Sequence, residues 1–198
     1  MSVPLRPLAF LGSSVLFLAA SFLSAAPKPP GMNPKALQAW MDSAAPVAAH
    51  QKLQALVGTW TTHQQDWLPT GELWNEADGS ATCHLLLGGR FVQEDYTTTL
   101  NGHPFHGLGV TGFDRQKNAY VAMWLDDFGT GFIPLEGTFD AAGRVLTLVG
   151  GVPPGRTTGG WRMTDTWWDK DHHTVAWWGQ GIDGKPVKLS EIRYTRNL

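Results

Sequence analysis

The feature that most constrains the fold of this chain is a change of sequence periodicity at Gly58. Beyond that residue, polar and apolar residues alternate in segments of about 7–11 residues rich in Trp, Tyr, Phe, Thr and Val. Turn-forming pairs such as Asn101-Gly102 and Asp183-Gly184 separate these segments. This pattern predicts an all-β domain built from consecutive antiparallel hairpins.

About ten strands are expected between Gly58 and Arg196. The segments are 58–67, 77–87, 90–100, 105–114, 120–126, 130–140, 145–151, 161–169, 174–182 and 187–196. A meander of this length most simply closes into an up-and-down barrel, which leaves no exposed sheet edge. A barrel of more than about eight strands has room for a ligand. A two-sheet sandwich is the alternative architecture.

The N-terminal 25 residues have the pattern of a secretory signal peptide. Arg6 supplies a positive charge, an apolar run from Leu8 to Leu23 follows, and small residues lead to cleavage after Ala25 or Ala26. We therefore expect an exported protein, periplasmic or secreted, with no stable membrane span once the signal is removed. An uncleaved membrane anchor is the alternative. Residues 26–33 form a proline-rich spacer.

Residues 34–57 predict a helical lead-in to a barrel domain at 58–198. Asn33 is placed to cap a first helix that begins at Pro34. Apolar residues at helical spacing give each of two short helices one apolar face. These positions are Leu37, Trp40, Met41 and Ala44, and then Ala49, Leu53, Leu56 and Val57.

Composition excludes several classes of protein. The 15 basic and 17 acidic residues give a formal net charge of −2, whereas a nucleic-acid-binding domain normally carries a basic stripe, so we expect no nucleic-acid partner. The single cysteine, Cys83, excludes an internal disulfide framework and a zinc site built from several thiolates. The seven histidines show no metal-binding spacing, so we predict no metal site.

The entry to the first strand resembles that of calycin barrels, which include lipocalins, fatty-acid-binding proteins and haem-binding nitrobindins. The resemblance rests on a short helix followed by Leu53-x-x-Leu56-Val57-Gly58-Thr59-Trp60. It implies that a basic residue of the last strand covers the indole of Trp60, and Arg196 is the candidate for this barrel closure. It also raises haem as a cofactor, although no proximal histidine matches; otherwise we predict no cofactor.

Over a longer stretch, the chain resembles a bacterial family of exported proteins, the domain of unknown function family 1579. Its motifs occur in order over nearly all of residues 50–196. They are His50-x-x-Leu53, Gly58-Thr59-Trp60, Leu87-Gly88-Gly89-Arg90-Phe91, Pro104-Phe105-x-Gly107-x-Gly109, Gly112-Phe113-Asp114, Trp124-x-Asp126 with Thr130, Gly137-x-x-Asp140-x-x-Gly143, and Tyr194-Thr195-Arg196. The resemblance implies a calycin-like barrel and leaves the function open.

The candidate ligand-binding residues lie on strands expected to be neighbours. They are His106, Leu108, Trp124, Asp126, Phe132 and Glu136. If these faces line the lumen, aromatic and aliphatic side chains supply apolar surface, while two carboxylates and an imidazole orient a small apolar or aromatic molecule. The simpler interpretation of Trp124-x-Asp126 is a core indole beside a carboxylate that caps a turn.

Two other functions remain open. An enzyme would need a histidine and a carboxylate in contact within the lumen, and His106 with Asp126 or Glu136 is the candidate pair. No other catalytic residue is indicated. A protein-interaction or envelope module with a filled barrel would use one exposed indole from each adjacent pair, Trp167-Trp168 and Trp177-Trp178.

Overall fold

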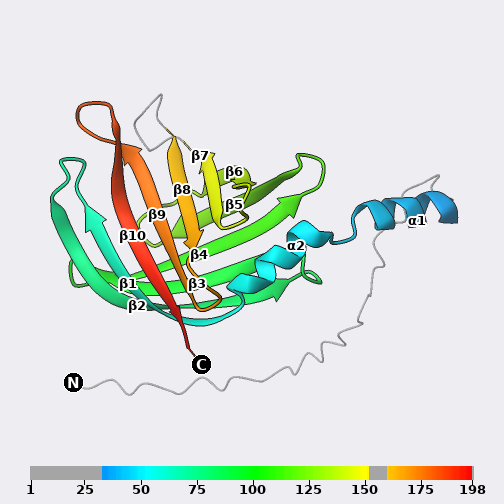
Figure 1. The fold of residues 1–198 in the computed structure, drawn as a ribbon, viewed down its shortest axis with the longest axis horizontal. Helices are drawn as coiled ribbons and strands as arrows, with labels where there is room; N and C mark the ends of the chain where they lie inside the picture. Colours follow the sequence, from blue (N-terminus) through cyan, green and yellow to red (C-terminus); the bar gives the residue numbers. More distant parts are fainter. Residues whose placement is uncertain (1–32, 152–159, 198) are drawn as a thin grey trace, which may run out of the picture. The chain divides into compact units, whose positions relative to one another are not determined.

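The protein is a closed antiparallel β-barrel of ten strands (Figure 1). The computed structural model describes residues 33–151 and 160–197. The strands are β1 Gly58–Trp67, β2 Leu73–Leu86, β3 Phe91–Leu100, β4 His103–Asp114, β5 Ala119–Asp126, β6 Ile133–Phe139, β7 Val145–Gly150, β8 Trp161–Trp167, β9 His172–Gln180 and β10 Pro186–Arg196. The predicted fold class is confirmed.

The barrel closes between its first and last strands. β1 pairs with β2 on one side and with β10 on the other, in a register that aligns Trp60 with Arg196 and Asp66 with Ser190. Every other strand pairs with its neighbours in chain order, as the succession of colours in Figure 1 shows. All ten strands therefore have partners on both sides, and the sandwich alternative is excluded.

Turn chemistry explains the hairpin between β3 and β4. Asn101 and Gly102 both have positive φ, at 48° and 80°. Two consecutive residues in this region form the tight turn whose twist matches that of the flanking strands. Here the predicted and observed strands differ little. β6, in contrast, begins at Ile133 rather than 130, because the chain first turns at Asp126, where the Gly129 N–H donates to the Asp126 carbonyl oxygen (3.3 Å).

The two predicted helices fall into different compact units, Met1–Ser43 and Ala44–Leu198. The described part of the first unit contains α1 (Pro34–Ser43). As predicted, Asn33 caps this helix: its side-chain oxygen accepts a hydrogen bond from the Ala36 N–H (2.8 Å). The predicted signal peptide and nearly all of the spacer lie outside the described residues.

The second helical segment closes one end of the barrel. α2 (Ala48–Lys52) contacts β4, and the short 3-10 helix η1 (Leu53–Leu56) contacts β2 and β3. Leu53 is buried in the core, the Trp60 indole N–H donates to the Leu56 carbonyl (2.9 Å), and the Tyr120 hydroxyl donates to the Ala49 carbonyl (3.0 Å). The barrel unit thus begins before Gly58, because η1 supplies part of its core.

The antiparallel topology defines a second end of the barrel. β1, β3 and β5 all run away from the helical segment, so Asp66, Leu100 and Asp126 lie at the end that α2 and η1 do not cover. Side chains occupy most of the covered half, with Trp60 and Leu148 completely buried. Space for a ligand is therefore expected at the uncovered end.

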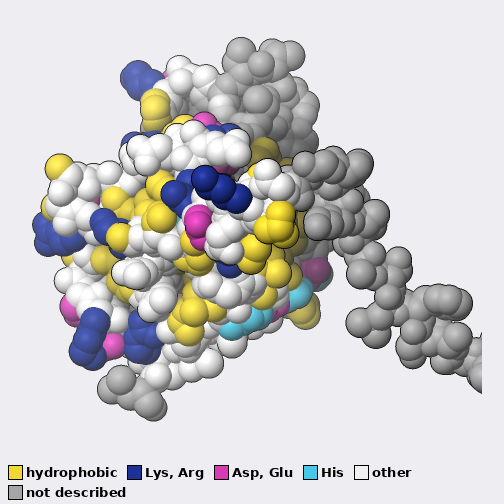
Figure 2. Space-filling view, turned by 90° about the vertical axis from the view of Figure 1, so that its right-hand side faces the viewer, with side chains coloured by type: hydrophobic (Ala, Val, Ile, Leu, Met, Phe, Trp, Pro, Cys, Tyr) yellow, Lys and Arg dark blue, Asp and Glu magenta, His cyan; other side chains and the backbone are white. Residues whose placement is uncertain are grey.

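The outer surface mixes side-chain types. On the face in Figure 2, basic side chains are interspersed with acidic, polar and hydrophobic ones. Among the helices of the described residues, none is long and apolar enough to cross a membrane.

Candidate functional site

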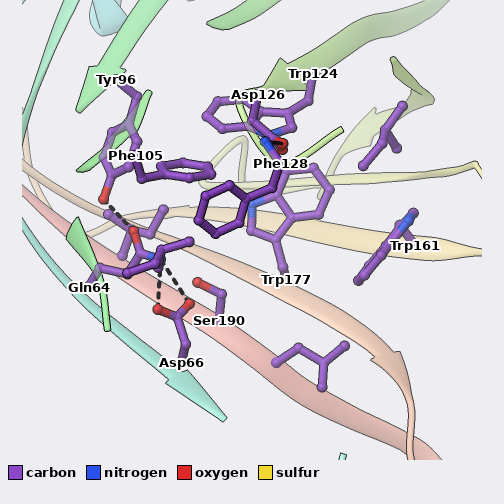
Figure 3. Close-up of a pocket in the computed structure, with 14 residues that line it drawn as sticks. Gln64, Asp66, Tyr96, Phe105, Trp124, Asp126, Phe128, Trp161, Trp177 and Ser190 are labelled. Atoms are coloured by element: carbon purple, nitrogen blue, oxygen red, sulfur yellow. Dashed lines mark hydrogen bonds between the residues drawn. The ribbon is translucent and has the colours of Figure 1, made fainter. Parts of the chain in front are cut away.

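A cavity of about 290 Å³ occupies the uncovered end of the barrel (Figure 3). Aromatic and aliphatic side chains form most of its wall. Its described lining residues are Gln64, Asp66, Tyr96, Leu100, Phe105, Trp124, Asp126, Phe128, Ile133, Trp161, Trp177, Leu189, Ser190 and Ile192. A mostly apolar cavity with a few polar groups is the usual form of a small-molecule site.

Glycine makes room for the central indole of this wall. Trp124 on β5 points inward and packs over Gly107 of β4, where an added Cβ atom would lie 2.2 Å from the indole ring. The neighbouring Gly109 also borders the same ring. The strand glycines of β4 therefore accommodate a bulky neighbour, and they fix the position of Trp124 in the cavity.

Asp126 performs two roles at the rim of the cavity. One carboxylate oxygen accepts the Trp124 indole N–H (2.9 Å), and the other accepts the backbone N–H of Phe128 (3.0 Å). Asp126 therefore caps the turn after β5 and also holds the indole that lines the cavity. The two interpretations of Trp124-x-Asp126 are compatible, because both residues border the cavity.

A second carboxylate, Asp66, is buried in the wall contributed by β1. It accepts hydrogen bonds from the side-chain amides of Gln64 and Asn75, each at 2.8 Å. Gln64 in turn accepts the Tyr96 hydroxyl at 2.5 Å, as the dashed lines of Figure 3 show in part. Asp66 is 5% exposed, and all of these partners are uncharged. The carboxyl group is therefore hydrogen-bonded by dipoles, with no cation among these partners.

The structure brings two of the six predicted ligand-binding residues to this cavity, Trp124 and Asp126. His106 and Leu108 belong to the opposite face of β4, since Phe105 and Gly107 point inward and side chains alternate along a strand. Accordingly, His106 is exposed, and neither it nor Leu108 lines the cavity.

Phe132 and Glu136 also lie outside the cavity. Trp124 pairs with Ile133, so Ile133 and not Phe132 points inward beside the indole. Phe132 is 61% exposed just before β6. Glu136 forms an ion pair with Lys117 on the surface. The prediction that Glu136 joins Trp124 in the lumen needs the other face of β6 to point inward. Only the register of the β5–β6 pair shows which face of β6 is internal.

Several lining residues were not predicted. Trp177 belongs to one of the adjacent tryptophan pairs, and alternation required one indole of that pair to point inward. In the other pair, Trp167 packs against the core while Trp168 is 68% exposed. Gln64 and Asp66 were detectable as polar residues on the same strand face as Trp60, although their hydrogen bonding depends on residues far away in sequence.

A smaller cavity of about 70 Å³ lies deeper in the barrel. Trp124, Trp177 and Ile192 border both cavities. His173 and Asp165 line the inner one and form a buried pair, with the imidazole Nδ1 2.7 Å from the carboxylate. Among the described residues, no group hydrogen-bonds the buried Nε2 of His173.

Aromatic rings hold this imidazole. His173 stacks on Trp167 with ring centres 4.5 Å apart and on Tyr194 at 4.3 Å. The Trp167 indole N–H also donates to Asp165 (3.2 Å). The Asp165 carboxylate accepts a hydrogen bond from Nδ1–H of this imidazole. In a neutral imidazole the other ring nitrogen, Nε2, is then a hydrogen-bond acceptor.

Glu94 adds a carboxyl group to the inner cavity. The Tyr194 hydroxyl donates to it at 2.8 Å. Burial raises the pKa of Glu94 by more than this hydrogen bond lowers it. Burial also raises the pKa of the Cys83 thiol far above its usual range, so Cys83 acts as a small buried hydrophobe.

The predicted catalytic pair is not formed. The His106 side chain is exposed on the outer face of β4, whereas Asp126 points inward and Glu136 pairs with Lys117. The histidine–carboxylate contact inside the barrel is instead that of His173 with Asp165. His173 and Asp165 meet because β9 pairs with β8. Since His172 and His173 are adjacent, the sequence did not indicate which of the two imidazoles is internal.

The larger cavity does not fit haem. Its described lining residues include no histidine, cysteine or methionine to ligate iron. Of these two cavities inside the barrel, His173 lines the inner one of about 70 Å³, which is too small for a porphyrin. Within residues 33–151 and 160–197, no group of three or more histidine, cysteine or acidic side chains is arranged to hold a metal ion.

Comparison with protein families matches residues 45–196 to the family described as "Protein of unknown function (DUF1579)". The chain belongs to this family. The match covers α2, η1 and all ten strands of the DUF1579 barrel, including Trp60, Trp124 and Arg196. None of the curated proteins compared with the chain matches it.

One of the solved structures similar to the DUF1579 barrel shares its fold. Rv2717c from M. tuberculosis is 16% identical, with a TM-score of 0.59 over 78% of this chain and 100% of that one. A de novo designed fluorescence-activating β-barrel is 15% identical, with a TM-score of 0.42 over 77% of this chain and 100% of the design. The likeness to Rv2717c shows a shared fold, and that to the design carries no further argument.

Proposed function

We propose that the protein binds a small apolar or aromatic molecule non-covalently in the cavity at the uncovered end of its barrel. The observation that carries this proposal is the cavity of about 290 Å³ walled by aromatic side chains. A cavity of this kind favours binding over the alternative of a filled barrel that acts through its outer surface.

The cavity wall is prearranged for binding. Gly107 and Asp126 fix Trp124 from two sides, and Phe105 packs edge-to-face on Phe128 with ring centres 5.4 Å apart. Rigid side chains lose little conformational freedom when a ligand binds. Phe128 is 62% exposed and lies in the turn after β5, so a ligand that covers it removes apolar surface from water.

Titration with the uncharged fluorophore N-phenyl-naphthylamine tests the proposal. Saturable binding is expected, and Trp124→Ala should weaken it by about tenfold, since the variant removes a large aromatic contact. The matched control is Trp168→Ala, which removes an indole that is 68% exposed and does not line the cavity. Equal binding by Trp124→Ala and the wild type would contradict the proposed site.

The buried His173–Asp165 pair favours proton transfer at the inner cavity as a second candidate function. Asp165 orients the imidazole, and the free Nε2 is the atom that would accept a proton. The test is incubation of the protein with a molecule that binds the outer cavity, followed by mass spectrometry of the small-molecule fraction. Conversion that is lost in His173→Gln supports this function, and binding without conversion contradicts it.

Export is a separate part of the proposal. It rests on the signal-peptide pattern of residues 1–25. Expression in a bacterium, followed by mass measurement of the protein in the periplasmic and secreted fractions, tests it. A mature chain that begins at Ala26 or Pro27 is expected, and a full-length chain retained with membranes would support an uncleaved anchor.

A further inference from the structure

We propose that the preferred ligand carries a positive charge, as an aromatic or alkyl amine does. This inference deepens the proposed function and rests on it. It concerns the charge of the larger cavity, whose lining contains two ionisable carboxyl groups, Asp66 and Asp126, and, among the described residues, no lysine, arginine or histidine.

Asp66 is a buried carboxyl group whose hydrogen-bond partners are neutral. Its oxygens accept hydrogen bonds from neutral amides of Gln64 and Asn75, and it is 5% exposed. A buried carboxylate is unfavourable unless it is hydrogen-bonded and paired with a cation. The amides supply the hydrogen bonds, and a cationic ligand would supply the missing opposite charge.

The neighbouring strand β10 carries a lysine, Lys188, which already has partners outside the cavity. Lys188 on β10 pairs with Glu191 and lies 4.6 Å from the ring centre of Trp67. Trp67 follows the inward-facing Asp66 on β1, so it belongs to the outer face of the barrel. Lys188 is thus held on the outer face, and it is not among the residues that line the cavity beside Asp66.

The aromatic wall of the cavity also favours a cation. Rings of Tyr96, Phe105, Trp124, Phe128 and Trp177 surround the same space. The faces of such rings attract cations, most strongly when water is excluded, and clusters of them recognise quaternary ammonium groups. In Figure 3, Asp66 and Ser190 lie on one side of the Phe128 ring and Asp126 lies on the other.

The carboxyl groups and the aromatic rings of the cavity favour the same kind of ligand, a cation. Carboxylates and ring faces both favour a cation, while both disfavour a carboxylate or a phosphate. An anionic ligand such as a fatty acid would meet Asp66 and Asp126 without a compensating basic side chain in the described lining. The cavity therefore selects for an apolar body with a protonated or quaternary amine.

Three probes of nearly the same shape test this inference by quenching of tryptophan fluorescence. They are benzyltrimethylammonium, the uncharged neopentylbenzene and the anionic phenylacetate. We expect the cation to bind at least about tenfold more tightly than the neutral isostere, and the anion to bind most weakly. Equal affinity of the cation and the neutral isostere, or preference for the anion, would overturn the inference.

Variants identify the source of the selectivity. Asp66→Asn should reduce the preference for the cation, measured as the ratio of its affinity to that of the neutral isostere, by about fivefold or more. Asp126→Asn is a second variant, needed because Asp66→Asn disturbs a buried hydrogen-bond network. The control is Asp78→Asn, which removes the same charge from an outer-face side chain that is 84% exposed. A cation preference that survives in both cavity variants would contradict the assigned role of the carboxylates.

The outcomes separate this inference from the proposed function. Binding of neopentylbenzene without a preference for the cation would leave the proposed function intact and refute the charge selectivity. No binding of any of the three probes or of N-phenyl-naphthylamine would refute both. Unfolding curves for each variant show that the compared proteins are folded.

Discussion

The guanidinium of Arg196 lies 4.0 Å from the centre of the Trp60 ring. Arg196 is on the last strand and Trp60 on the first, so this contact joins the two ends of the barrel sequence. The same guanidinium donates to the carbonyl oxygens of Val57 and Ala55, each at 2.6 Å. Arg196 thus connects β10 both to the strand beside it and to the helical segment that covers this end.

Trp60→Ala is expected to lower the free energy of unfolding by about 3–5 kcal/mol, because the indole is completely buried. Arg196→Lys should cost about 1.5–3 kcal/mol, since lysine keeps the charge but cannot donate to two carbonyls in a fork. Denaturant unfolding measures both. An unchanged unfolding midpoint in either variant would contradict the closing role of the pair.

Gly107→Ala is expected to disturb the cavity through Trp124. The new methyl group would lie 2.2 Å from the indole ring, so the ring must move, at a cost of about 1–3 kcal/mol. Ligand binding should weaken together with stability. Gly131→Ala is the control, since nothing lies within 4 Å of its added methyl group. Similar effects of the two substitutions would show that Trp124 is not held by Gly107.

Glu94 should make stability depend on pH. Its pKa is raised in the folded protein, so above the pKa of the unfolded chain the folded state binds more protons than the unfolded one. The free energy of unfolding therefore falls as pH rises from the unfolded pKa through the folded one. Glu94→Gln should flatten this dependence, as measured by denaturant titrations from acid to neutral pH. A slope equal to that of the wild type would argue against a raised pKa.

Asp165→Ala should lower the free energy of unfolding by about 2–5 kcal/mol, since it leaves both the buried His173 imidazole and the Trp167 indole N–H without their hydrogen-bond partner. The adjacent histidine provides a control. His172 pairs with Asp169 at 2.9 Å, but both side chains are exposed. Asp169→Ala should therefore leave the melting temperature nearly unchanged, because water screens an exposed pair. Comparable losses in the two variants would contradict the burial argument.

The local features of the barrel follow from the sequence. Hairpins form where Asn101-Gly102 and similar pairs permit positive φ, and a helix begins where Asn33 precedes Pro34. Alternation along each strand establishes which residues share a face. These properties depend on neighbours within a few residues, so a single sequence is sufficient to determine them.

Which of the two faces is internal depends on the tertiary structure. Trp124 and Asp126 were placed together correctly because they lie two residues apart on one strand. The other four candidates, on β4 and in or just before β6, were expected to line the lumen, but the structure places them outside the cavity. The deciding pairs, Trp124 with Ile133 and Gly107 with Asp126, are long-range. A one-residue change of register exchanges the two faces, and nothing local distinguishes them.

The sequence by itself therefore determined the strands, the turns, the class of fold and the residues able to form an aromatic wall. Only the closed barrel decided that Asp66, Tyr96 and Trp177 meet Trp124 around one cavity, and that His173, not His106, contacts a buried carboxylate. The physical reason is that alternation and turn chemistry act between near neighbours, whereas a cavity forms where five or more strands place side chains in a common space.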